Sequence, residues 1–296
     1  MLFRSPKGRS LWDDARRRLM RNSAAVASLC VVTLLVVLAA AGPQLWLRLS
    51  GADFGAIFRA EIAIPPTSAH MHWLGTDTEG RDMVARALLG LRISLLVGIA
   101  ATFVALIIGV AWGAIAGFAG GVVDKVMMRL VDVLHTVPFI FFVIVFVTVI
   151  NPPDPAQRLT LIVMAIGAVG WFAMARIVRG QAVALRRKEF VEAARAAGAR
   201  PIEIVTRHIA PNLLGPVVAL AALNLPAIIL AESFLSFLGL GVREPLASLG
   251  ALIAKGVGQA QAPWLLVTPS VLMLSLLLAL NTFGDGLRDA LDPKQR

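Results

Sequence analysis

Six long runs of apolar residues alternate with polar segments along the chain. The runs lie at about 24–47, 93–118, 133–151, 159–178, 212–238 and 264–283. Because about 20 apolar residues cross a bilayer as a helix, each run predicts one transmembrane helix. The third run is the weakest, since Asp132 and His135 crowd its start and we expect Pro138 to kink it. The pattern therefore predicts an all-α membrane protein with six transmembrane helices.

The first run follows a basic tail, residues 1–23, and shares features with a secretory signal. It has a basic start, an apolar stretch and the letters AAA at 39–41. Its apolar stretch is longer than the roughly 7–15 residues of a signal h-region, so we expect a retained transmembrane helix. Cys30, the only cysteine in the sequence, lies within this run, which excludes disulfide and cysteine-based metal frameworks.

Composition agrees with a membrane protein, and the distribution of charge predicts which segments face the cytoplasm. The chain is 58% hydrophobic and 16% charged, with a mean hydropathy of +0.79. A net charge of +10 could indicate nucleic acid, but twenty of the 28 Lys and Arg residues fall on one side of the alternating spans. This is the positive-inside pattern, and it places both termini and the segment after the fourth run in the cytoplasm. We expect no nucleic-acid partner.

Motifs that would indicate catalysis or metal binding are missing from the sequence. None of the five lysines is followed by Ser or Thr, so there is no P-loop, and there is no HExxH, GxSxG or Cys/His cluster with ligand spacing. His70 and His72 form an HxH pair without a nearby third ligand, and we interpret them as residues of a solvated loop. The sequence predicts no catalytic, cofactor or metal residues and no enzymatic activity.

Glu232 is the one carboxylate deep in an apolar run, within LPAIILAESFLSFLGLG. An ionisable side chain at membrane depth is costly and is a functional candidate by default. We expect a packing or gating role, with hydrogen bonds to Ser or Asn on a neighbouring helix, in preference to contact with a substrate. A proton-coupled transporter would carry a relay of such groups, and one glutamate is thin evidence for that alternative.

The segment before the second run contains a candidate helix start. Thr76 followed by Glu79 fits a capping box, in which each side chain bonds the backbone amide of the other residue. Arg81, Asp82 and Arg86 would then share one side of a short helix at the membrane surface. We expect a surface helix here and not a binding site.

The stretch FVEAARAAGARPIEIVTRHIAP, residues 190–211, is too charged for the hydrocarbon core and too regular for a slack loop. Residues 182–197 are rich in Ala, Leu, Arg and Glu and favour a helix. Gly198 is placed to end that helix as a left-handed cap, and Pro201 suits the first position of a second short helix. The second helix is expected to run to about His208. The sequence therefore predicts two short helices joined by a glycine hinge.

The first of these helices is predicted to carry a face of small side chains. The face consists of Ala193, Ala194, Ala196 and Ala197. A face of small apolar side chains gains nothing from exposure to water, but it allows another protein surface to approach the helix closely. We therefore predict that it docks against a cytoplasmic partner.

The same stretch resembles the EAA loop of ABC importer permeases, where the loop docks in a cleft of the ATP-hydrolysing subunit. The match consists of Glu192, Ala193 and Ala194, then Gly198 after three residues, and Pro211 thirteen residues later. The pattern typical of the family has Ile three residues before the proline, where this chain has His208. The variant RHIAPN resembles the peptide/nickel branch. The segments LGTDTEGRD, RISLLVG, AESFLSFLGLG and GDGLRDALDP resemble the same branch, so the likeness covers nearly the whole chain.

The resemblance implies a type I ABC importer transmembrane domain over residues 92–285, with a cytoplasmic coupling loop at 182–211. It implies one extra N-terminal helix at 24–47, a periplasmic segment at 48–91 and a cytoplasmic tail at 286–296. Its implied partners are a sister permease, two cytoplasmic ATPases that bind ATP and Mg, and a periplasmic peptide-binding protein. The implied location is the bacterial inner membrane. The implied substrates are oligopeptides, with dipeptides, glutathione and nickel complexes as alternatives.

Overall fold

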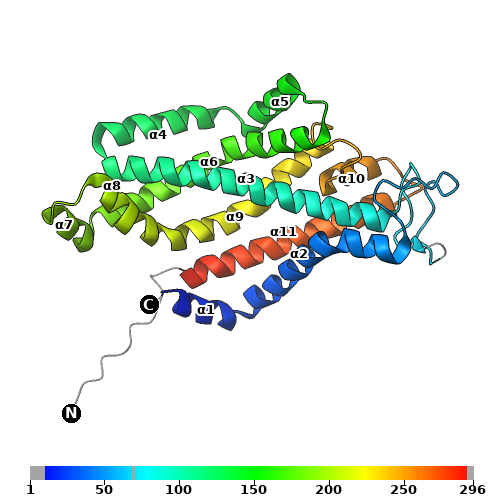
Figure 1. Ribbon diagram of the computed structural model, residues 1–296, viewed down its shortest axis with the longest axis horizontal. Coiled ribbons are helices and arrows are strands. Elements are labelled where there is room, and N and C mark those ends of the chain that lie inside the picture. The colour runs from blue at the N-terminus through cyan, green and yellow to red at the C-terminus, as the bar shows by residue number, and fades with distance from the viewer. Residues whose placement is uncertain (1–10, 69–70, 292–296) are drawn as a thin grey trace, which may run out of the picture.

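The computed structural model describes residues 11–68 and 71–291, and these residues are almost entirely helical (Figure 1). The helices are α1 (Leu11–Arg21), α2 (Ser23–Ser50), α3 (Met83–Ala119), α4 (Gly121–Thr136), α5 (Phe139–Ile150), α6 (Pro155–Arg186), α7 (Glu189–Ala196), α8 (Pro201–Ile204), the π-helical turn η2 (Val205–Ile209), α9 (Ala210–Phe237), α10 (Leu249–Gly256) and α11 (Trp264–Leu291). Within this part of the chain the sole β pairing is an isolated bridge between Thr76 and Asp82. The predicted all-α fold is confirmed.

Five helical stretches of the described chain are long and apolar enough to cross a membrane. They are α2, α3, α6, the continuous stretch Pro201–Phe237 and α11. The third predicted span is not one helix over 133–151: its place is taken by the pair α4 and α5, bent by 77° at their junction. Pro138 explains the break, because it donates no amide hydrogen and pushes the residue before it to extended backbone, as at Val137 with φ −80° and ψ 126°.

Helices α3 and α6 form the closely packed spine of the bundle. Glycines of α3 at every fourth position, Gly109, Gly113 and Gly117, lie against α6. A Cβ added at Gly113 would lie 2.5 Å from the carbonyl oxygen of Ala175 and 2.9 Å from the amide nitrogen of Arg179. Small residues at such spacing let two helix backbones approach in a membrane. The end of α6 is therefore held firmly against α3.

The extra N-terminal helix α2 packs against α11 and α3. Its Leu35 and Ala39 share an apolar cluster with Leu276 of α11 and Leu91 of α3. The side chain of Asn22 accepts a hydrogen bond from the Ala25 amide and caps α2 after the short helix α1. Helix α11 continues to Leu291, past the end of the predicted span.

The two ends of the bundle carry different structures. Helices α7 and α8 lie toward one end with α1 and the end of α11, whereas the 51–82 segment and α10 lie at the other (Figure 1). The charge distribution predicted that the N-terminal part, the loop at 182–211 and the C-terminal part share one side of the membrane. In the structure α1, α7, α8 and the end of α11 lie toward the same end of the bundle (Figure 1), which agrees with that prediction. Residues 1–10 and 292–296 of the predicted tails lie outside the described residues.

Candidate functional site

The α7–α8 hairpin, Glu189–Ile204, connects α6 to the last part of the bundle. Residues 182–197 were predicted to form one helix, and that prediction is wrong at Arg187 and Lys188, where the helix is interrupted. Helix α6 runs to Arg186, and an extended Lys188 with ψ 145° separates it from α7. The separation turns the chain so that Val191 is fully buried against the bundle.

Gly198 closes α7 in the way the sequence predicted. Its φ of +82° is in the left-handed region, where glycine avoids the steric cost that a Cβ would impose. The Gly198 amide donates to the Arg195 carbonyl at 2.9 Å, and the Ala199 amide donates to the Ala194 carbonyl at 3.0 Å. These two bonds form a Schellman motif. The predicted left-handed cap is confirmed.

Helix α8 begins at Pro201, as predicted, but it does not end before the next span. The Arg200 amide donates to the Glu203 carboxylate at 3.1 Å at its start. The turn η2 then joins α8 to α9 without a break, so the predicted end near His208 is wrong. Pro211 explains the wider π turn, because its ring crowds the carbonyl four residues earlier and it lacks an amide hydrogen.

The inner side of the hairpin is anchored by apolar contacts. Val191 of α7 and Ile204 of α8 are buried in a cluster with Ala114 of α3 and with Val178 and Ala182 of α6. Burial of side chains of this size stabilises the attachment by about 1.5–3 kcal/mol each. The hairpin is therefore fixed to the ends of α3 and α6.

The outer side of the hairpin presents small and apolar side chains. Of the residues expected to form one alanine face, Ala194 is half-buried against the bundle, whereas Ala193, Ala196 and Ala197 are exposed together with Glu192 and Gly198. The uniform face predicted for α7 is therefore wrong at Ala194, because that side of the helix packs inward. Ile202 of α8 is 66% exposed. An exposed surface of this composition fits a docking site.

Glu232 lies inside the bundle on α9, where its side chain is fully buried. Its carboxylate accepts hydrogen bonds from Ser94 of α3 at 3.1 Å, from Ser233 at 3.3 Å and from Ser236 at 2.7 Å. Ser94 in turn accepts from the Leu249 amide at the start of α10, at 3.2 Å. The predicted hydrogen bond to a serine on a neighbouring helix is confirmed, and the carboxylate joins α3, α9 and α10.

The histidine predicted to lie in a solvated loop is buried instead. His72 Nδ1 lies 2.8 Å from Asp82 and its Nε2 lies 2.7 Å from Glu61; Trp46 of α2 donates to Asp82 at 2.9 Å. The solvated-loop prediction for His72 is wrong, because two carboxylates bond its ring nitrogens and the Phe58 ring packs edge-on against it. His70 lies outside the described residues. The described ranges contain no group of three or more His, Cys, Asp or Glu side chains that could hold a metal ion.

The capping box predicted at Thr76 and Glu79 is also wrong. The N-cap is Asp82, whose carboxylate accepts from the Ala85 amide at 2.8 Å, and α3 runs unbroken from Met83. Thr76 bonds instead across the loop, accepting from the Ile64 amide at 2.9 Å. There is therefore no separate surface helix around Arg81, Asp82 and Arg86. Arg81 and Asp82 lie in the turn before α3, and Arg86 lies in the first turn of α3 itself.

Charged residues from distant segments meet beside this turn. Arg81 donates to Glu244 at 2.6 Å and also pairs with Glu79, while Lys255 of α10 donates to Glu79 at 2.9 Å. Arg86 donates to the Pro245 carbonyl at 3.0 Å. The hydrogen bond from Arg81, aided by Lys255, lowers the pKa of Glu244 to about 2. This cluster fastens the loop after α9 to the start of α3.

The contacts of His72 predict a pH dependence of stability. Burial acts to lower its pKa, but the hydrogen bonds and charges of Asp82 and Glu61 outweigh it and raise the pKa of His72 above 6.5. A raised folded-state pKa gives stability that is present below about pH 6.5 and is lost as pH rises through the folded-state pKa. We expect the thermal midpoint of the purified protein to fall over that interval. His72→Gln should lack this fall, and equal pH slopes for the two proteins would contradict the assignment.

Two protein families match the chain in segments that together cover most of it. Residues 109–296 match the binding-protein-dependent transport system inner membrane component, and residues 10–55 match the N-terminal transmembrane domain of oligopeptide transport permease C. The chain belongs to the family of binding-protein-dependent transport permeases, the membrane subunits of ABC importers. Permeases of this family work with a partner permease, ATPases and a substrate-binding protein.

Curated relatives match along nearly the whole chain. The oligopeptide transport system permease protein OppC of Escherichia coli K12 is 49% identical over 98% of this chain and 93% of its own length. OppC of Haemophilus influenzae is 47% identical over 98% of this chain and 91% of its length. The dipeptide transport system permease protein DppC of Bacillus subtilis is 39% identical over 97% of this chain and 87% of its length. The relatives are permease subunits, in agreement with a translocation subunit that is not an enzyme.

A solved structure shows the same fold. A chain of the inward-facing MetNI methionine ABC transporter matches with a TM-score of 0.56 and 20% sequence identity, over 71% of this chain and 98% of that one. Together with the family match over residues 10–55, this likeness gives a type I importer domain preceded by an additional N-terminal helix.

Proposed function

We propose that this chain is the permease subunit of an oligopeptide importer in the bacterial inner membrane, with its termini in the cytoplasm. Its proposed partners are a sister permease of the OppB type, ATPases of the OppD and OppF types, and a peptide-binding protein of the OppA type. Near-complete coverage by relatives named OppC at 47–49% identity supports the substrate class. The ATPases bind ATP and Mg, and the permease itself needs no cofactor.

The proposed coupling element is the α7–α8 hairpin, and its geometry is the observation that carries the mechanism. Its inner side is buried at Val191 and Ile204, so that a force on the hairpin moves α3 and α6. Its outer side exposes Glu192, Ala193 and Gly198 to a partner, and Ala194 lies between the two sides. Pro211 contributes by imposing the π turn that carries α8 directly into α9. Closure of the ATPases would pull on this hairpin and change which side of the membrane the permease pair opens to.

A dipeptide importer is the second candidate. The 39% identity to the dipeptide permease DppC of Bacillus subtilis favours it over glutathione or nickel complexes, for which the relatives named above give no support. Growth of an auxotrophic deletion strain on defined peptides distinguishes the two. Restoration by tetrapeptides and pentapeptides supports an oligopeptide importer, and restoration by dipeptides alone supports the second candidate.

The test of the coupling proposal is recovery of an ATPase. The tagged chain, expressed with its operon neighbours, is expected to bring down an ATPase that hydrolyses MgATP. Ala193→Arg, on the outer side of α7, should abolish that recovery, because a long charged side chain blocks close approach. Ala60→Arg, at an exposed alanine of the opposite end, should leave it intact. Failure of the unmodified chain to bring down any ATPase would contradict the proposal.

A further inference from the structure

Helix α4 lies between two joints and packs against the bundle along one side only. At its start Gly120 and Gly121 have φ values of +67° and +58°, and at its end the chain bends by 77° at Pro138. Asp124 and Val131 are its only buried residues, and its Val122 and Val126 are exposed. The apolar packing of α4 is therefore confined to one cluster, in which Val131, with Met128 and Leu134 beside it, packs against Trp171 and Phe172 of α6.

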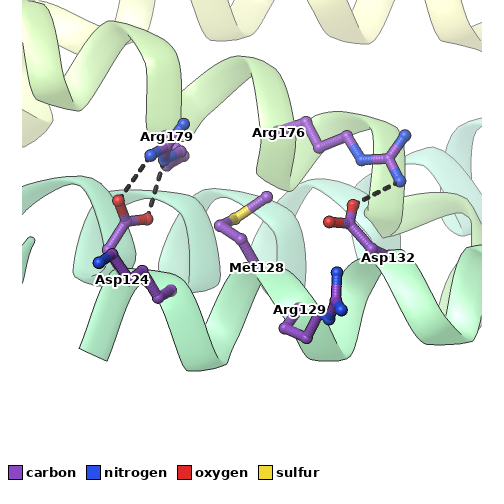
Figure 2. Close-up of a pocket in the computed structure, with 7 residues that line it drawn as sticks. Asp124, Met128, Arg129, Asp132, Arg176 and Arg179 are labelled. Atoms are coloured by element: carbon purple, nitrogen blue, oxygen red, sulfur yellow. Dashed lines mark hydrogen bonds and ion pairs between the residues drawn. The ribbon is translucent and has the colours of Figure 1, made fainter. Parts of the chain in front are cut away.

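Two ion pairs connect α4 to α6 across a cleft of 680 Å³ (Figure 2). Asp124 accepts hydrogen bonds from Nε and Nη2 of Arg179 at 2.8 Å and 2.6 Å, and Asp132 accepts from Arg176 at 2.9 Å. The aspartates are eight residues apart, so they lie on one face of α4, two turns from each other. A bidentate pair with arginine fixes direction as well as distance.

The arginines of both ion pairs lie on the last part of α6, which leads directly to the α7–α8 hairpin. Arg179 is followed by about two helical turns to Arg186, where α6 ends. Arg186 itself donates to the Ala119 carbonyl, at 3.2 Å, beside the joint between α3 and α4. A displacement of the hairpin is thus passed along α6 to both arginine pairs and to the first joint of α4.

The far end of α4 borders a second cavity within the bundle. This cavity has a volume of 390 Å³ and lies where the break at Pro138 meets α6 and α9. His135 of α4 and Asn224 of α9 line it. Movement of α4 would change this cavity, because Pro138 and His135 belong to its wall.

We propose that the pairs Asp124–Arg179 and Asp132–Arg176 form a coupling strap, which transmits movement of the α7–α8 hairpin to α4 and to the cavity at Pro138. The inference rests on the proposed function, because it assumes that ATPases move the hairpin. The four residues are positioning residues and need not touch the peptide. Exposed ion pairs in water contribute only about 0–1 kcal/mol, so their importance here comes from the direction and distance that they fix between α4 and α6, and not from stability.

The test is charge reversal in the complete importer reconstituted in proteoliposomes. Asp124→Arg and Arg179→Asp are each expected to lower the number of peptides imported per ATP about tenfold, and the double variant should restore at least half of it. The same holds for Asp132→Arg with Arg176→Asp. Arg129→Asp is the matched control, because Arg129 lines the cleft but joins neither pair, and it should couple normally.

Copurification of the ATPase in every variant separates this inference from the proposed function. If the single reversals couple normally in an intact complex, or if the double variants fail to recover, the strap is overturned while the docking hairpin stands. Asp132→Asn, which keeps the size of the side chain, is used if a reversal prevents assembly. It should lower coupling in the same direction, and unchanged coupling would count against the strap.

Discussion

Replacing Gly198 with valine is expected to lower peptide uptake about tenfold while the chain still inserts and assembles. Gly198 has a φ of +82°, and an L-residue with a Cβ in the left-handed region loses roughly 1–2 kcal/mol, with β branching making the position worse. Since 1.4 kcal/mol is about a factor of ten, relief of this strain by reorienting α8 against α7 accounts for the size of the effect. Uptake of labelled peptide and ATP hydrolysis are measured on the same proteoliposomes.

Gly258→Val is the matched control for this variant. Gly258 has a φ of +84°, and, as at Gly198, an added Cβ would meet no atom within 4 Å. It lies between α10 and α11, at the other end of the bundle from the hairpin (Figure 1). Both variants therefore introduce the same backbone strain, and we expect only Gly198→Val to separate ATP hydrolysis from uptake. Near-normal uptake by Gly198→Val would show that the hairpin is not the coupling element.

Local signals in the sequence predicted the features that local backbone chemistry determines. The left-handed cap at Gly198 and the helix start at Pro201 follow from the permitted φ values of those two residues, and no distant contact alters them. Five of the six apolar runs likewise became single long helices, because a span must satisfy its own backbone hydrogen bonds.

Contacts between distant segments determined the features that the sequence did not predict. Thr76 and Asp82 are both good N-cap residues, and the choice of Asp82 depends on Trp46, 36 residues earlier, and on His72. The burial of His72 depends likewise on Glu61. A sequence window around the HxH pair contains no sign of these partners, and a solvated loop was the reasonable interpretation.

The hairpin shows both kinds of determinant in one element. Its turn was predicted because Gly198 and Pro201 encode it, but the direction that α7 faces was not. That direction is set by burial of Val191 against α3 and α6, which turns Ala194 inward and leaves Ala193 outside. The alanines are therefore not one equivalent surface: Ala194 fits the hairpin to the bundle, and Ala193 remains available to a partner.

Replacing Glu232 with alanine should destabilise the permease by about 3 kcal/mol, because the serines that donate to its carboxylate lose their buried acceptor. The vacated volume adds a cavity term. Glu232→Gln keeps one acceptor oxygen and should cost less. The thermal midpoint of the purified complex in nanodiscs measures both, with Asp289→Ala as the control for loss of an exposed carboxylate outside the hairpin.

Comparison of the loss of thermal stability with the loss of peptide uptake then shows whether Glu232 has a packing role or acts in transport. A carboxylate that joins α3, α9 and α10 predicts that uptake falls only as far as the amount of folded complex falls. If Glu232→Ala melts at the wild-type temperature and yet loses uptake, the carboxylate acts on the substrate or on a gate, and its assignment to packing is wrong. If stability falls and uptake per folded complex is retained, the serine-bound carboxylate is a structural link among α3, α9 and α10.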